Sequence, residues 1–116
     1  MGDNVILVKS KTFALRIIKL HQFLNAEKRE YILSKQLLRS GTSIGANVRE
    51  AVYAFSKKEF AAKMSIALKE ASETAYWLEL LFESDYITEP QYNHIYSDCE
   101  EVIKLLASIV KSSKKE

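Results

Sequence analysis

Hydrophobic positions in this chain of 116 residues recur every three or four residues, a spacing that predicts four amphipathic helices. The first is expected over about residues 10–24, the second over 30–55, the third over 57–85, and the fourth from about 88 onward. Since only a few residues connect them, successive helices should be antiparallel neighbours. The pattern therefore predicts one all-α domain, residues 1–116, folded as an up-down-up-down four-helix bundle.

The four apolar stripes define the expected core. They are Phe13, Ile17, Leu20, His21 and Leu24; Leu33, Leu37, Gly41, Ile44, Gly45, Val48, Val52 and Phe55; Phe60, Met64, Ala67, Leu68, Ala71, Ala75, Leu78 and Phe82; and Tyr92, Ile95, Tyr96, Cys99, Val102, Ile103, Leu106 and Ile109. Glycine inside a helix is about 1 kcal/mol less favourable than alanine. Two glycines on the second stripe therefore indicate that a neighbouring backbone approaches closely there.

Local signals set the expected helix ends. Ser56-Lys57-Lys58-Glu59 and Thr88-Glu89-Pro90-Gln91 are capping boxes, in which the first and last side chains each accept a hydrogen bond from an otherwise unpaired amide. Polar residues 25–29 are expected to break the chain between the first two helices. A short N-terminal arm is expected over 1–9 and a solvated basic tail over 111–116.

A row of polar side chains runs beside the apolar stripe of the second helix. We call it the polar ridge: Gln36, Ser40, Ser43, Asn47 and Glu50, ending at Ala54, with Arg39 close by. Polar groups at such positions need hydrogen-bond partners, because burying them unpaired is unfavourable. The favoured interpretation is a structural ladder that fixes helix register and assembly. The alternative is a small-molecule or nucleotide pocket.

The third helix has apolar residues away from its core stripe. Ala62, Ile66, Tyr76 and Leu80 share this outer face. Several exposed apolar side chains along one helix predict a surface for self-association, whereas scattered apolar residues on a monomer are the alternative.

Charge is segregated along the chain although the net charge is only +2. Residues 1–69 contain 13 Lys/Arg and five Asp/Glu, whereas residues 70–103 contain nine Asp/Glu and no Lys/Arg. The two regions are expected to pair within the fold or between copies. A basic surface that could bind nucleic-acid phosphates would comprise Lys35, Arg39, Arg49, Lys57, Lys58 and Lys63.

The residues give little support for catalysis or metal binding, and no cofactor is expected. The two histidines and one cysteine lack zinc-site spacing, and the Glu-x-x-His motif of di-iron bundles is missing. His21 is expected in the core or at an interface, His94 with Asp98 as a surface pair, and Cys99 as a buried apolar residue. No stretch approaches the roughly 20 apolar residues of a membrane span, so no membrane contact is expected. The lone Cys99 cannot form an internal disulfide and the chain shows no signal-peptide pattern, so a cytoplasmic location is expected.

The stretch from Gln36 to Ala51, followed by Ser56 to Phe60 and by Ala67 through Leu78, resembles a bacterial family encoded in intervening sequences of 23S ribosomal RNA genes. The resemblance covers roughly residues 10–110. It implies a four-helix bundle that assembles into a ring, commonly a pentamer, with no known enzymatic activity. It also implies a distant similarity in fold to the accessory variability determinant of diversity-generating retroelements, which binds nucleic acid.

The sequence is consistent with two functions. In the first, the protein forms a ring that is not an enzyme and binds RNA or DNA without strong sequence preference. The alternative is a scaffold that binds another protein and ignores nucleic acid. Salt dependence separates them, because displacing phosphate counterions makes binding weaken steeply as salt rises.

Overall fold

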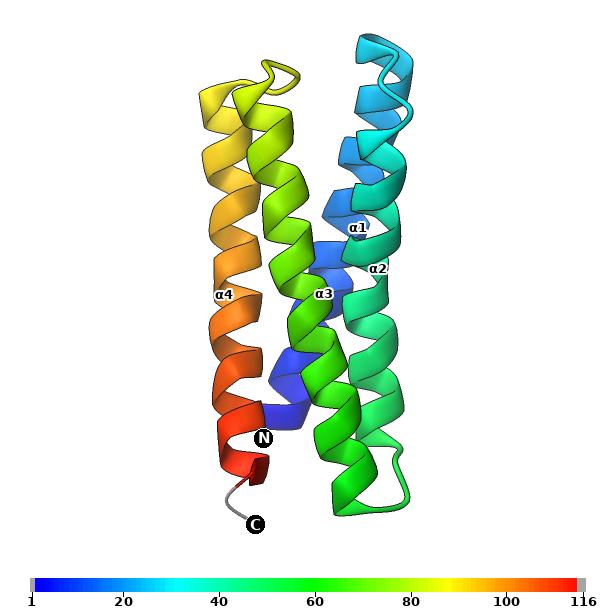
Figure 1. The fold of residues 1–116 in the computed structure, drawn as a ribbon, viewed down its shortest axis with the longest axis vertical. Coiled ribbons are helices and arrows are strands. Elements are labelled where there is room, and N and C mark those ends of the chain that lie inside the picture. Colours follow the sequence, from blue (N-terminus) through cyan, green and yellow to red (C-terminus); the bar gives the residue numbers. More distant parts are fainter. Residues whose placement is uncertain (1, 115–116) are drawn as a thin grey trace.

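The computed structural model describes residues 2–114, with side chains from Val5 onward. Four helices make up the fold: α1 (Gly2–Lys28), α2 (Leu33–Val52), α3 (Lys57–Glu83) and α4 (Glu89–Lys114). They run alternately up and down in a rod whose Cα atoms extend 46 × 20 × 19 Å (Figure 1). The predicted all-α four-helix bundle is confirmed.

The two ends of the rod are made of different parts of the chain. The upper end holds the α1–α2 connection, residues 29–32, and the α3–α4 connection, residues 84–88 (Figure 1). The lower end holds the α2–α3 connection, residues 53–56, together with the start of α1 and the end of α4.

The expected N-terminal arm is wrong, because residues 2–9 form the first turns of α1. Ile6 and Ser10 extend the stripe of Phe13 and Ile17 toward the N-terminus, and all four side chains are buried. The expected break at residues 25–29 is also too early. The helix continues to Lys28 and ends where Arg29 adopts a left-handed conformation, with φ of 51°.

Helix α2 is shorter than predicted at both ends. At its start, the Glu30 carboxylate accepts hydrogen bonds from the backbone N–H groups of Ile32, Leu33 and Ser34 at 3.2, 3.0 and 2.7 Å. These groups lack partners within the helix, so Glu30 acts as its cap. At the other end the helix stops at Val52, and Phe55, expected on the core face, is fully exposed instead.

Both capping boxes are confirmed. Ser56 accepts a hydrogen bond from the Glu59 N–H at 3.0 Å, and the Glu59 carboxylate accepts one from the Phe55 N–H at 3.2 Å. Thr88 and Gln91 make the reciprocal pair at the start of α4. The expected C-terminal tail is helical as far as Lys114, and residues 115–116 of that tail lie outside the described residues.

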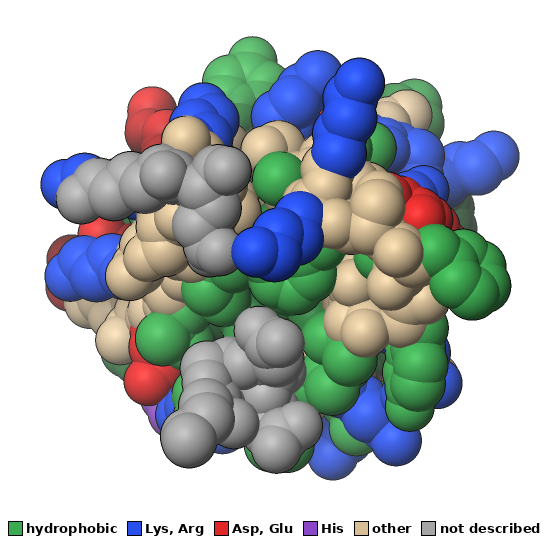
Figure 2. Space-filling model, turned by 90° about the horizontal axis from the view of Figure 1, so that it is seen from below, with side chains coloured by type: hydrophobic (Ala, Val, Ile, Leu, Met, Phe, Trp, Pro, Cys, Tyr) green, Lys and Arg blue, Asp and Glu red, His purple; other side chains and the backbone are tan. Residues whose placement is uncertain are grey.

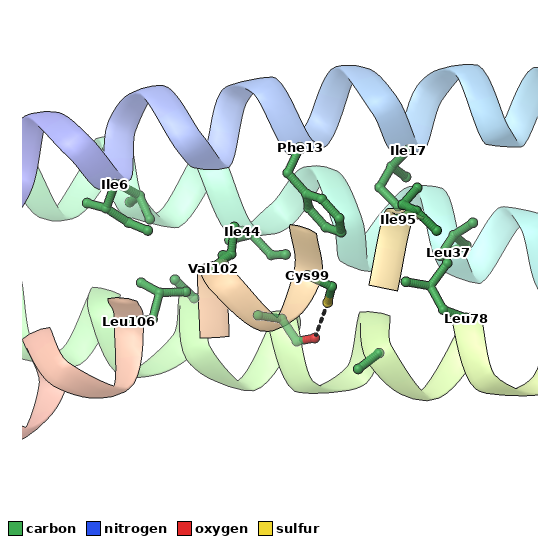
Figure 3. Packing of buried hydrophobic residues seen from close by; sticks show 14 of the residues in the cluster. Ile6, Phe13, Ile17, Leu37, Ile44, Leu78, Ile95, Cys99, Val102 and Leu106 are labelled. Carbon is green, nitrogen blue, oxygen red and sulfur yellow. Dashed lines mark hydrogen bonds between the residues drawn. The ribbon is translucent and has the colours of Figure 1, made fainter. Parts of the chain in front are cut away.

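All four helices contribute to one hydrophobic core. Figure 3 shows Phe13 and Ile17 of α1 facing Leu37 and Ile44 of α2. At Gly41 the close neighbour is a side chain and not the predicted backbone, because an added Cβ would lie only 2.8 Å from Ile17 Cγ2. Gly45 has more room, with its nearest neighbour at 3.5 Å. Within residues 2–114, none of the helices is apolar over a length that would cross a bilayer.

Candidate nucleic-acid interface

The first half of the polar ridge contacts α3. Ser40 is fully buried and accepts a hydrogen bond from the Thr74 hydroxyl at 2.9 Å. Arg39 forms ion pairs with Glu70, at 3.3 Å, and with Glu73, and its Nε donates to Gln36. In this part of the ridge, Ser40 and Arg39 therefore bond across to α3 within one chain, and a role in register and assembly stays a prediction.

The second half of the ridge is bonded mainly to its own helix. Ser43 donates to the Arg39 carbonyl at 2.6 Å, and Asn47 donates to the Ser43 carbonyl at 2.9 Å. Both side chains are half-buried. Glu50 is exposed and pairs with Lys63 of α3 at 2.7 Å. Around Ser43 and Asn47, the ridge presents polar groups without a cross-helix hydrogen bond among the described residues.

The six basic candidates fall into three groups. Arg39 and Lys63 form the ion pairs described above, and the Glu50 carboxylate raises the pKa of Lys63 through a hydrogen bond and charge attraction. Lys35 is exposed near the upper end of α2. Arg49, Lys57 and Lys58 are exposed near the lower end. The structure therefore divides the predicted basic surface: three of its six cations lie near the lower end, one near the upper end and two in ion pairs between α2 and α3.

Sequence reasoning missed further cations that the fold brings to the lower end. Lys111 and Lys114 lie in the last turn of α4, and Lys11 of α1 lines a shallow groove together with Arg49. Seen from below, blue Lys and Arg side chains stand around a partly hydrophobic surface (Figure 2). The predicted topology could have located them, because an antiparallel bundle places the end of α4 beside the α2–α3 connection.

The lower end also carries exposed aromatic side chains. Phe55 is 100% exposed and Tyr53 is 75% exposed. Next to Phe55, a groove of about 580 Å³ lies between the α2–α3 connection and the last turns of α4. Its lining residues are Ala51, Val52, Ala54, Phe55, Ser56, Lys57, Phe60, Ser108, Ile109, Ser112 and Ser113.

Four of the nine carboxylates in the acidic region, Glu70, Glu73, Asp98 and Glu101, form ion pairs with the basic region of the same chain. Arg39 reaches α3, Arg16 pairs with Asp98, and Lys9 pairs with Glu101 at 3.2 Å. These contacts use cations and carboxylates of the middle and upper rod. The charge segregation of the sequence is therefore partly neutralised within one bundle, away from its lower end.

The predicted oligomer face lies on the outside of α3. Ile66 is 41% and Tyr76 is 52% exposed, Ala62 is exposed, and Leu80 is half-buried. The Tyr76 ring also contacts Trp77, with centroids 5.2 Å apart. Self-association through this face stays a prediction.

The cysteine and the two histidines contact neighbouring residues of the bundle. Cys99 is buried, its thiol faces the Ala71 carbonyl at 3.5 Å (Figure 3), and burial raises its pKa to about 12. His21 bonds to Asn25, and Arg16 bridges His94 and Asp98. Across residues 2–114, no three His, Cys, Asp or Glu side chains gather in a way that could hold a metal ion.

Comparison with known proteins agrees with the fold. A crystal structure of a protein of unknown function from the S23 ribosomal protein family of Bacteroides thetaiotaomicron is similar to this chain, with 57% sequence identity and a TM-score of 0.94. The match covers 96% of this chain and 99% of that one. No functionally curated protein matches, and no enzymatic family is indicated. The family model described as 23S rRNA-intervening sequence protein matches residues 2–108, and the chain therefore belongs to that family.

Proposed function

We propose that this protein is not an enzyme and binds RNA or DNA, without strong sequence preference, through the lower end of the bundle. The observation that carries the proposal is the gathering of exposed Arg49, Lys57 and Lys58 with Lys111 and Lys114 at that end. Phosphates are contacted by such cations regardless of base sequence. The proposal includes a cytoplasmic location, where a free thiol such as that of Cys99 stays reduced.

The proposal includes assembly into a ring of copies, a pentamer as the family resemblance implies. The exposed apolar face of α3 and the half-buried Ser43 and Asn47 support such contacts. In a cyclic assembly each interface is heterologous, so every copy presents the same lower end in the same direction. Phosphate contacts then multiply with the number of copies.

The ring is tested by sedimentation of the purified protein. Wild-type protein is expected to sediment as an oligomer, and Asn47→Leu is expected to shift it toward smaller species. Lys114→Ala, an exposed change on α4 and not on the ridge helix, is the control and should leave the sedimentation coefficient unchanged. A monomeric wild type at micromolar concentration would contradict ring assembly.

Nucleic-acid binding is tested by fluorescence anisotropy with RNA and DNA of mixed sequence at two salt concentrations. Binding should weaken steeply with salt, and the double variant Lys57→Glu/Lys58→Glu should bind at least about tenfold more weakly. Lys35→Glu reverses one exposed cation near the upper end and should have a small effect. Equal effects of the two changes would contradict a site at the lower end.

A protein scaffold is the second candidate, because the groove beside Phe55 has apolar walls and the outer face of α3 is apolar. Apolar docking depends little on salt, unlike phosphate binding. Absence of binding to any nucleic acid at low salt would remove the first proposal and favour this one.

A further inference from the structure

Phe55 is a fully exposed aromatic residue in a connection whose backbone is held by hydrogen bonds. Its backbone N–H donates to the Glu59 carboxylate, and the neighbouring Ser56 caps α3. On the other side, the Ala54 N–H donates to the Ala51 carbonyl at 3.0 Å and ties the connection to α2. A phenyl ring wholly in water contributes nothing to the core, so its placement on an ordered turn suggests a surface for a ligand.

The groove beside Phe55 has a mixed lining. Val52, Phe60 and Ile109 give it apolar walls, whereas Ser108 and Ser112 add hydroxyl groups from α4. Flat, partly polar ring systems such as nucleobases suit this combination, since their faces are apolar and their edges carry hydrogen-bonding groups. At about 580 Å³ the groove is within the size range of small-ligand sites.

Cations flank both exposed aromatic side chains. Lys57 lines the groove beside Phe55, and Lys58 follows it in the first turn of α3. Tyr53 lines a second shallow groove with Arg49 and Lys11. Alternation of aromatic and basic side chains is the arrangement by which proteins hold single strands: bases stack on rings while the backbone follows the cations.

Resting on the proposed function, we infer that the lower end prefers single-stranded nucleic acid, with unpaired bases stacked on Phe55 and seated in the groove. Paired bases in a duplex are already stacked and cannot enter the groove unless they are extruded. Lysines alone would suffice for a duplex and would leave the exposed Phe55 without a role. Stacking on the Phe55 ring therefore favours single-stranded over double-stranded nucleic acid.

The test separates bases from phosphates. Three probes of equal length are titrated by fluorescence anisotropy: a thymidine strand, an abasic strand with the same phosphates, and a duplex. Wild-type protein should bind the thymidine strand about tenfold more tightly than the abasic strand, the size expected for base stacking. Phe55→Ala should remove this difference and leave abasic binding unchanged, and Phe55→Trp should retain it.

A matched control exists at the other end of the rod. Tyr31 is also an exposed aromatic residue, at 58%, in the α1–α2 connection. Tyr31→Ala should leave all three affinities unchanged. Because Phe55 makes no core contact, circular dichroism should show that Phe55→Ala keeps the wild-type fold and melting temperature.

The possible failures are distinct. If wild type binds the thymidine and abasic strands equally, or if Phe55→Ala weakens both alike, the inference is overturned and phosphate binding stands. If none of the probes binds, the proposed function falls and the inference with it. If an acidic peptide containing phenylalanine binds the groove while bases add no affinity, the inference is overturned in favour of a protein partner.

Discussion

The upper and lower halves of the bundle use their polar residues differently. In the upper half, Ser40 bonds to Thr74 and Arg39 pairs with two glutamates of α3. In the lower half of the same helix, Ser43 and Asn47 bond only to the backbone of α2 among the described residues. The comparison separates polar groups that hold the helices together from polar groups left available at a surface.

Aromatic residues follow this division in part, since Tyr31 at the upper end is also 58% exposed. Near the upper end, Trp77 donates to Glu73 at 2.9 Å, and Tyr92 stacks on Phe82 with ring centroids 4.4 Å apart. At the lower end, Tyr53 and Phe55 are largely or fully exposed. The lower end, which carries the proposed binding surface, exposes two aromatic side chains but also has a cross-helix ion pair between Glu50 and Lys63. The following variants test that difference.

The largest effect on stability is expected at Glu30, which joins α1 to α2 at the upper end. Its carboxylate accepts three backbone hydrogen bonds, and the residue as a whole is 8% exposed. Glu30→Ala leaves those amides unpaired and should lower the free energy of unfolding by about 2–3 kcal/mol. Urea unfolding at fixed protein concentration measures it. Glu30→Gln, which keeps one acceptor oxygen, should lose less, and equal losses would contradict the capping role.

Replacing each of the two glycines of α2 by alanine should change the free energy of unfolding in opposite directions. At Gly41 a new methyl group would press on the buried Ile17 side chain, so Gly41→Ala should destabilise the fold by about 1–2 kcal/mol. At Gly45 the nearest atom, Ser10 Oγ, is at an ordinary 3.5 Å. There the better helix propensity of alanine should stabilise by about 0.5–1 kcal/mol. Paired thermal melts measure both, and equal signs would contradict the difference in packing.

The bundle itself follows closely from the sequence, because burial imposes the helical period on the apolar residues. The two capping boxes are predictable for a similar reason: their signal is local. The missed boundaries have weaker local signals. Helices α1 and α3 end at left-handed residues that are not glycine, with φ of 51° at Arg29 and 68° at Asp85, and α2 is capped by a glutamate in place of Ser, Thr, Asp or Asn.

The candidate site is harder to predict because it depends on contacts across helices. Nothing local to Arg39 or Lys63 indicates that a carboxylate of another helix lies beside each of them. Phe55 continues the spacing of Val48 and Val52, so its spacing predicts burial. Since α2 ends at Val52, the helical phase is lost and the ring is exposed.

Two serines one turn apart on α2 test the comparison directly. Ser40 is buried and accepts the Thr74 hydroxyl, so Ser40→Ala should lower the free energy of unfolding by about 1 kcal/mol. Ser43 is half-buried and bonds to its own helix, so Ser43→Ala should change it by less than about 0.5 kcal/mol. Urea unfolding at a low, fixed protein concentration keeps assembly from contributing. A larger loss of stability for Ser43→Ala than for Ser40→Ala would show that Ser43 makes a stabilising contact within one chain, and would contradict the comparison.

The smallest effect is expected from Tyr96, whose hydroxyl donates to the Glu79 carboxylate at 2.8 Å. This hydrogen bond, together with burial, raises the pKa of Tyr96 above its usual value near 10. A raised folded pKa means that the protonated tyrosine stabilises the fold below pH 10, and that this contribution is lost as pH rises above it. Tyr96→Phe should therefore be slightly less stable than wild type at pH 7 and lose less stability between pH 9 and 11. Urea midpoints that shift equally with pH in both proteins would show that the Tyr96–Glu79 bond does not contribute to the stability of the upper half.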